Sequence, residues 1–253
     1  MKKGETARRR RASPGRRLRP FWFLIAVIVV LAVIGGYLLA SWPALYPHTV
    51  EVDGNRTVSK ETIIGHAHIN FAANMWLQNT AAMAARIESI PYIDQTYVHR
   101  RPPDMLVITV TERTPYALVD YGGERFTIDH ALRVLQDGVP PEFAGSLPAF
   151  TIVLPQAPVV GQFIVDPDLL ALVPDADALA AAHLDARSLG YDRFGDVTVQ
   201  LRNHVAVLLG DRSGSVPKIS LIRPILDKVD RGKRRVTAVD LRALTTPVVV
   251  YAK

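Results

Sequence analysis

Few residues of this 253-residue chain are of a type and spacing that could do chemistry. Cysteine is absent, which excludes disulfides, thiolate-ligated zinc and a cysteine nucleophile. The sequence has no Gly-x-x-x-x-Gly-Lys-Ser/Thr phosphate loop and no Gly-x-Ser-x-Gly turn for a nucleophilic serine. His66 and His68 could chelate a metal ion, but no third ligand follows at a suitable spacing. We therefore predict no catalytic residue, no metal site and no cofactor.

Two further pairs favour structural roles over catalysis. Lys218 and Ser220 lie two positions apart on an expected helix, so they do not face each other as a Ser/Lys protease pair must. Asp240 and Arg242 alternate on an expected strand and therefore point the same way, which is typical of an ion pair. Such a pair could also orient a charged partner.

The last strand of the chain is the strongest candidate for binding. It comprises Val248, Val249, Val250 and Tyr251. A strand at the edge of a sheet leaves backbone N–H and C=O groups available to an incoming strand. Backbone bonds would then supply affinity, and alternate side chains would supply specificity. The competing interpretation, that these residues only complete the core of the sheet, stays open at this point.

The elements that position these residues begin with a charged N-terminus. The net charge is +6, and residues 1–20 alone hold nine basic residues against one acidic residue. The other 233 residues are slightly acidic, which argues against a nucleic-acid partner. A basic segment of this kind suits the anionic surface of a membrane.

Residues 21–42 carry no charge and have aromatic residues at both ends, which predicts a transmembrane helix. The positive-inside rule places residues 1–20 in the cytoplasm and the rest of the chain outside. A cleaved signal peptide is the alternative. Its apolar core is usually shorter, and the best candidate for its small-x-small cleavage site is the weak one at Leu38 and Ala40.

Residues 46–116 predict a small domain of order β-α-α-β-β. An alternating strand near 50–53 is followed by a helix capped by Ser59, then by a helix over 74–89, and finally by strands over 92–100 and 106–111. The second helix has an apolar stripe of Trp76, Thr80, Met83, Ile87 and Ile90. Glu112 and Arg113 are interpreted as a solvated strand end.

Residues 117–253 predict a β-rich domain, so the fold class is α+β. Five prolines indicate loops over 139–158, and an Ala/Leu-rich segment predicts a helix over 167–189. A hairpin over 197–209, an amphipathic helix over 218–230 and strands over 235–241 and 248–251 complete the order.

Several of these segments resemble the FtsQ/DivIB cell-division family. Residues 50–63 and 87–117 are similar to its POTRA domain, including Arg100, Pro103, Glu112, Arg113 and Pro115. Residues 119–131, 205–210 and 239–242, together with Lys218, are similar to its β domain. The resemblance is weak over 140–190.

The resemblance implies a non-catalytic divisome scaffold that links early and late division proteins and helps regulate septal peptidoglycan synthesis. Its implied partners are FtsB-like and FtsL-like single-span proteins, together with other divisome components. Its implied location is the cell (inner) membrane at the division septum. We assign the FtsB/FtsL-like contact to Val248–Tyr251 with Asp240 and Arg242. A second docking edge is expected at Val50, Glu51, Val52 and Asp53.

Two other classes of function remain open. One is a single-span extracytoplasmic protease or wall hydrolase, which a serine probe or a wall-digestion assay would detect. The other is a POTRA-type chaperone, which would bind unfolded β-strand peptides.

Overall fold

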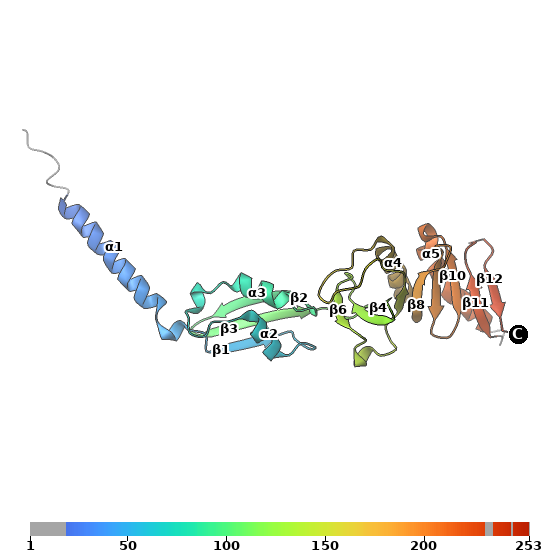
Figure 1. The fold of residues 1–253 in the computed structure, drawn as a ribbon, viewed down its shortest axis with the longest axis horizontal. Helices are drawn as coiled ribbons and strands as arrows, with labels where there is room; N and C mark the ends of the chain where they lie inside the picture. The colour runs from blue at the N-terminus through green and yellow to red at the C-terminus, as the bar shows by residue number, and fades with distance from the viewer. Residues whose placement is uncertain (1–18, 231–234, 244, 253) are drawn as a thin grey trace, which may run out of the picture.

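The protein is an α+β protein with one N-terminal helix and two separate sheets, which follow one another along an extended chain (Figure 1). The computed structural model describes residues 19–230, 235–243 and 245–252. Residues 1–18 of the expected cytoplasmic tail lie outside these ranges. The expected domain boundaries at residues 46, 116 and 117 stay predictions.

Helix α1 (Arg19–Ala40) has the length and composition of a membrane span. At ~1.5 Å per residue it is long enough for the hydrocarbon core. Its segment Phe21–Ala40 has a mean hydropathy of 2.9, and none of it is buried against the rest of the protein. No other helix in the described ranges meets these criteria. The apolar helix therefore supports a single membrane anchor, as expected.

The first sheet has the strand order β1-β3-β2, with β1 (Thr49–Asp53) parallel and β2 (Ile93–Arg101) antiparallel to β3 (Met105–Glu112). Helices α2 (Lys60–Ala67) and α3 (Thr80–Glu88) pack against it. The expected β-α-α-β-β order is confirmed. Ser59 caps α2 by accepting a hydrogen bond from the Thr62 backbone N–H. The core of this unit consists of Val52, Ile63, Ala67, Ile87, Ile90, Ile93, Ile108 and Val110.

The second helix of this unit is shorter than the sequence predicts. Asn74 caps a 3₁₀ turn, η3 (Met75–Leu77), and Asn79 caps α3 separately, so the chain breaks between the two. Met75 is therefore fully buried, whereas Trp76 is 52% exposed. The predicted apolar stripe holds for Met83, Ile87 and Ile90 and is wrong at Trp76.

The turn after β1 requires glycine. Gly54 has a φ of +88°, and a Cβ atom there would lie 2.1 Å from the Val110 carbonyl oxygen. We expect Gly54→Ala to destabilise the first sheet unit by about 2–3 kcal/mol, because positive φ and overlap both oppose a side chain. Thermal unfolding of the detergent-solubilised chain measures this. Gly65→Ala is the control, since its Cβ meets nothing within 4 Å and it should not destabilise. Equal stability of the two variants would contradict the expectation.

The second sheet has nine strands in the order β12-β11-β10-β9-β8-β7-β4-β5-β6. Helices α4 (Pro167–Ala181) and α5 (Ser215–Asp230) contact each other and the sheet (Figure 1). The strands are β4 (Ala117–Tyr121), β5 (Glu124–Ile128), β6 (Val134–Asp137), β7 (Ala149–Thr151), β8 (Ala186–Tyr191), β9 (Val197–Leu201), β10 (Ala206–Gly210), β11 (Val236–Asp240) and β12 (Val248–Tyr251). Short 3₁₀ turns occur at Pro43–Leu45, Pro141–Phe143 and Arg212–Gly214.

The expected hairpin, the 218–230 helix and both C-terminal strands are confirmed within this sheet. The helix predicted over 167–189 is wrong at its end. It stops at Ala181, and residues 186–189 belong to β8, which pairs with β9 and β7. The Ala/Leu-rich composition favours a helix locally, but pairing with two strands outweighs that preference.

Candidate partner-binding edges

Strand β12 is the terminal strand of the nine-stranded sheet. It pairs with β11 in antiparallel register, with Val239 opposite Val249 and Asp240 opposite Val248. No other strand in the described ranges pairs with its outer side. The residues expected at a sheet edge therefore lie at one.

The backbone of Val249 points away from β11. The Val250 carbonyl oxygen accepts a hydrogen bond from the Thr237 hydroxyl, and the Ala252 N–H donates to the Arg235 carbonyl oxygen. Residues 250 and 252 thus face β11. Because backbone groups of alternate residues point to opposite sides of a strand, the N–H and C=O of Val249 face outward. This is the geometry that strand addition uses.

The side chains of β12 are mostly accessible. Val248, Val250 and Tyr251 are exposed, and Val249 is half-buried opposite the fully buried Val239. The interpretation that this strand only completes the core is therefore wrong for three of its four residues. The strand contributes one side chain to the core side and leaves an apolar strip accessible.

Asp240 and Arg242 form the ion pair that the sequence indicates. The Arg242 Nη2 and Asp240 Oδ2 atoms are 2.6 Å apart, and the Arg242 backbone N–H also donates to the Asp240 carboxylate. The hydrogen bond from the Arg242 side chain holds the pKa of Asp240 below its usual value. The Arg242 side chain is 56% exposed, so the pair lies beside β12 with its cation accessible to a partner.

Lys218 binds the backbone of Arg242, one member of this ion pair. It is buried, and its Nζ donates to the Leu209 and Arg242 carbonyl oxygens. Ser220 is exposed, and its hydroxyl donates to the Pro217 carbonyl oxygen. The two side chains bind separate backbone carbonyls, so they do not form a Ser/Lys catalytic pair. Lys218 instead ties α5 to the ends of β10 and β11.

The second expected edge, β1, is also a terminal strand. Val52 is buried and Val50 is half-buried, whereas Glu51 and Asp53 are exposed. Glu51 lies 3.4 Å from the guanidinium of Arg101, which is the last residue of β2. The accessible side chains of this edge are thus acidic, in contrast with the apolar strip of β12.

Sequence reasoning missed the junction between the two sheets. Arg113 is only 12% exposed, and its guanidinium binds Asp94 at 2.5 Å and Asp129 at 2.6 Å. The Arg133 guanidinium donates to the Glu88 carbonyl oxygen at 3.1 Å, and both guanidinium groups lie over the Phe163 ring. These contacts join the end of the first unit to the start of the second.

Glu112 is not a solvated strand end either. Its carboxylate accepts hydrogen bonds from the backbone N–H groups of Arg56, Thr57 and Val58 at 2.8, 2.8 and 2.9 Å. Burial raises the pKa of Glu112, but these backbone donors outweigh it and hold the pKa below its usual value. The prediction that Glu112 and Arg113 form a solvated strand end is therefore wrong. Glu112 binds backbone N–H groups more than 50 residues away in the sequence, and Arg113 binds the carboxylates of Asp94 and Asp129.

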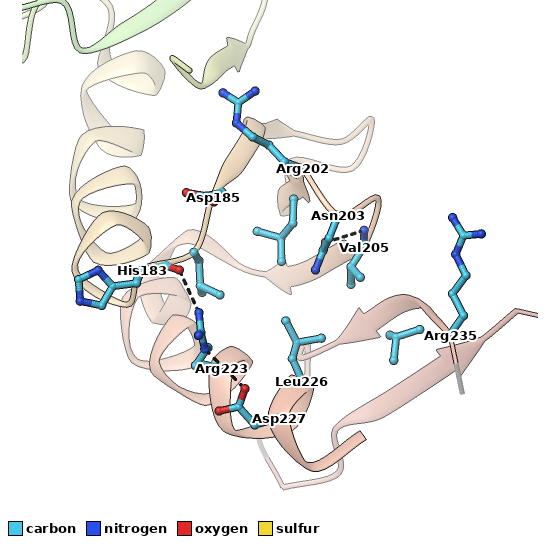
Figure 2. Close-up of a pocket in the computed structure, with 12 residues that line it drawn as sticks. His183, Asp185, Arg202, Asn203, Val205, Arg223, Leu226, Asp227 and Arg235 are labelled. Atoms are coloured by element: carbon cyan, nitrogen blue, oxygen red, sulfur yellow. Dashed lines mark hydrogen bonds and ion pairs between the residues drawn. The ribbon is translucent and has the colours of Figure 1, made fainter. Parts of the chain in front are cut away.

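A pocket of about 470 Å³ opens between the end of α4, the β9–β10 turn, α5 and the start of β11 (Figure 2). Arg223 donates to the His183 carbonyl oxygen at 3.2 Å and lies 3.5 Å from Asp227. Arg202 and Arg235 line other parts of its wall. Its charged groups largely bind backbone groups or one another. No sequence motif indicates this pocket, because its walls come from four separate segments.

The candidate metal ligands do not meet. His66 lies in the last turn of α2 and its Nδ1 contacts the Thr62 carbonyl oxygen, whereas His68 ends the helix with a φ of 50°. Among the described residues, no group of three or more His, Asp or Glu side chains could hold a metal ion.

Asp175 of α4 is a buried carboxyl with one donor, the Ser215 hydroxyl at 2.6 Å. Burial raises its pKa, so the folded state holds the proton more strongly than the unfolded state, and stability falls as pH rises through the folded pKa. We expect Asp175→Asn to leave stability unchanged below pH ~4 and to increase it at neutral pH.

Asp177, on the same helix, provides a control of opposite sign. Burial alone would raise the pKa of Asp177, but hydrogen bonds from His130 and Tyr116 outweigh it and hold that pKa below its usual value. Asp177→Asn should therefore destabilise the protein at neutral pH. Urea unfolding at acidic and neutral pH measures both variants, and a shift in the same direction for the two would contradict this explanation.

These features define a class: a protein with a single candidate membrane span, a small β-α-α-β-β unit and a distal sheet with an open edge. Residues 47–113 match the family described as the POTRA domain, FtsQ-type. Curated relatives named Cell division protein FtsQ come from Syntrophotalea carbinolica (32% identical over 117 residues, 44% of this chain and 42% of the relative) and Streptomyces collinus (34% over 122 residues, 47% and 46%). A third, from Anaeromyxobacter, is 27% identical over 198 residues, 74% of this chain and 67% of the relative.

The chain thus contains an FtsQ-type POTRA domain and is similar to proteins named Cell division protein FtsQ. The Syntrophotalea and Streptomyces matches span less than half of each chain, and the alignment with the Anaeromyxobacter protein extends beyond the POTRA domain. The expected resemblance to FtsQ proteins and the α+β fold with its FtsQ-type POTRA domain are thereby confirmed, and these relatives support a role in division.

Proposed function

We propose that this protein is a non-catalytic scaffold of the division machinery, which links early and late division proteins and helps regulate septal peptidoglycan synthesis. The relationship to FtsQ proteins carries the proposal. It is supported by the open β12 edge at the end farthest along the chain from the membrane helix (Figure 1). A scaffold needs accessible binding edges and an anchor rather than a catalytic centre.

The proposed orientation places the N-terminus in the cytoplasm and both sheets outside. Nine basic residues within residues 1–20, before the apolar segment, support this orientation through the positive-inside rule. The proposed location is the cell (inner) membrane at the division septum. A fusion at the N-terminus therefore leaves both sheet edges accessible.

The proposed partners at β12 are FtsB-like and FtsL-like single-span proteins. A segment of such a partner would add a strand beside Val249, and its side chains would contact Val248, Val250 and Arg242. The β1 edge, with Val50, Glu51, Val52 and Asp53, would receive other divisome components. Its exposed Glu51 and Asp53 suit a basic partner segment.

An N-terminal fluorescent fusion in dividing cells tests the function. We expect a ring at the division site from a fusion that replaces the native protein and sustains division. Uniform membrane fluorescence from such a fusion would contradict a divisome role. In that case a serine probe and binding of unfolded β-strand peptides would test the protease and chaperone alternatives.

A further inference from the structure

The segment between α2 and α3 is attached to the end of the membrane helix. The Asn74 side-chain amide donates to the carbonyl oxygen of Ala40, the last residue of α1, at 3.1 Å. Asn74 is buried, and its Oδ1 accepts from the Trp76 N–H at 2.9 Å. Figure 1 shows the chain that leads into α3 beside this end of α1. The η3 turn therefore lies beside the C-terminal end of the apolar helix α1.

The segment between α2 and α3 exposes large apolar side chains, as does the residue range just after α1. Phe71, Trp76 and Leu77 are 50%, 52% and 73% exposed, and Trp42, just after α1, is 58% exposed. We call these four side chains the membrane-side surface. An exposed apolar surface of this kind in a folded domain generally marks a contact with another molecule or with lipid.

Side-chain hydrogen bonds from Arg100 and Gln78 hold the η3 turn in place. The Arg100 side chain donates to the Met75 carbonyl oxygen at 2.8 Å and to the Gln78 carbonyl oxygen at 2.6 Å, and its guanidinium lies 5.7 Å from the centre of the Trp76 ring. Gln78 in turn donates to the Asn70 carbonyl oxygen. The exposed side chains are thus presented by a fixed backbone.

The segment carries no negative charge that would oppose a lipid surface. Residues 62–87 contain no Asp or Glu, and Arg86 is their one formal charge at pH 7. Anionic phospholipid headgroups therefore do not repel this segment, and tryptophan prefers the level of the headgroups.

We propose that the membrane-side surface lies in the headgroup region of the same bilayer that α1 spans and docks the POTRA domain onto it. The proposal rests on α1 being a membrane anchor. Lipid is the occupant because the Asn74–Ala40 bond keeps Trp76 at the end of the span. Docking fixes the angle at which the domain leaves the membrane and hence the direction in which the distal sheet extends.

Tryptophan quenching in nanodiscs tests this contact. The full chain is reconstituted in phosphatidylcholine and phosphatidylglycerol, with or without acyl-brominated phosphatidylcholine. In the variant Trp22→Phe/Trp42→Phe, Trp76 is the only tryptophan. We expect brominated lipid to quench its emission to an extent comparable with that of Trp42 in the variant Trp22→Phe/Trp76→Phe.

A distal reporter sets the background. Phe194, in the β8–β9 turn, is 75% exposed, and Phe194→Trp in a chain without its three native tryptophans should be quenched little. Trp76 quenching at the level of this reporter, with Trp42 strongly quenched, would overturn the docking while the anchor stands. Weak quenching of Trp42 would overturn the anchor and the docking together.

Discussion

Replacing Arg113 by methionine is expected to destabilise the protein by about 3–5 kcal/mol and to loosen the connection between its two sheets. The substitution removes the cation that binds Asp94 and Asp129, and Asp129 is itself nearly buried, with a side chain 7% exposed. Asp129 would keep the hydrogen bond from the Arg133 backbone N–H at 2.7 Å, but it would lose the cation that offsets the cost of desolvating its charge. Denaturation of the detergent-solubilised chain and limited proteolysis near residues 113–117 measure the two effects.

Arg101→Met is the matched control for charge. Arg101 also forms an ion pair, with Glu51 at 3.4 Å, but the two side chains are 64% and 45% exposed. Exposed pairs of this kind contribute about 0–1 kcal/mol, so this variant should remain near the wild type. If both variants lose equally little stability and resist proteolysis alike, the junction does not depend on Arg113.

Val249→Pro is expected to weaken partner binding at least about tenfold while leaving the fold intact. Proline lacks the N–H that Val249 directs away from β11, and proline is tolerated at the edge of a sheet when its nitrogen faces outward. Co-purification of the partner proteins from dividing cells, followed by titration with the partner obtained, measures the loss. Circular dichroism and thermal unfolding establish that the variant is folded.

Val249→Ala separates the backbone from the side chain. It keeps the N–H and shortens a half-buried side chain, so it should retain most of the affinity. A folded Val249→Pro variant that binds as well as Val249→Ala would show that partners do not add a strand at this edge.

Local patterns predicted much of the fold. The alternation of Val50 and Val52, the Ser59 cap and the alternation over 106–111 lead directly to β1, α2 and β3, because each depends on neighbouring residues only. The run Val248–Tyr251 likewise predicts a strand from its own residues, and the sheet order places this strand at an edge, as expected.

The predictions from sequence are wrong where contacts between residues distant in the sequence determine the local structure. Arg113 at a strand end looks solvated in the sequence, yet its partners are Asp94 and Asp129, which only the packing of two units brings together. Trp76 fits a helical stripe, but two asparagine caps interrupt the helix and turn its ring outward. Residues 186–189 favour a helix until they pair with β7 and β9. Lys218 belongs to a motif in the sequence, but its burial against the Leu209 and Arg242 carbonyl oxygens depends on how α5 packs on the sheet.

Photo-cross-linking from the β12 edge tests the central claim most directly. A photoreactive amino acid replaces Val250, which is 47% exposed, in the full-length chain in dividing cells, and replaces Val153, which is 97% exposed away from that edge, as the control. We expect position 250, and not position 153, to cross-link to small single-span division proteins identified by mass spectrometry. No such cross-link from position 250 in a chain that still sustains division, or equal cross-linking from both positions, would contradict a scaffold that works through this edge.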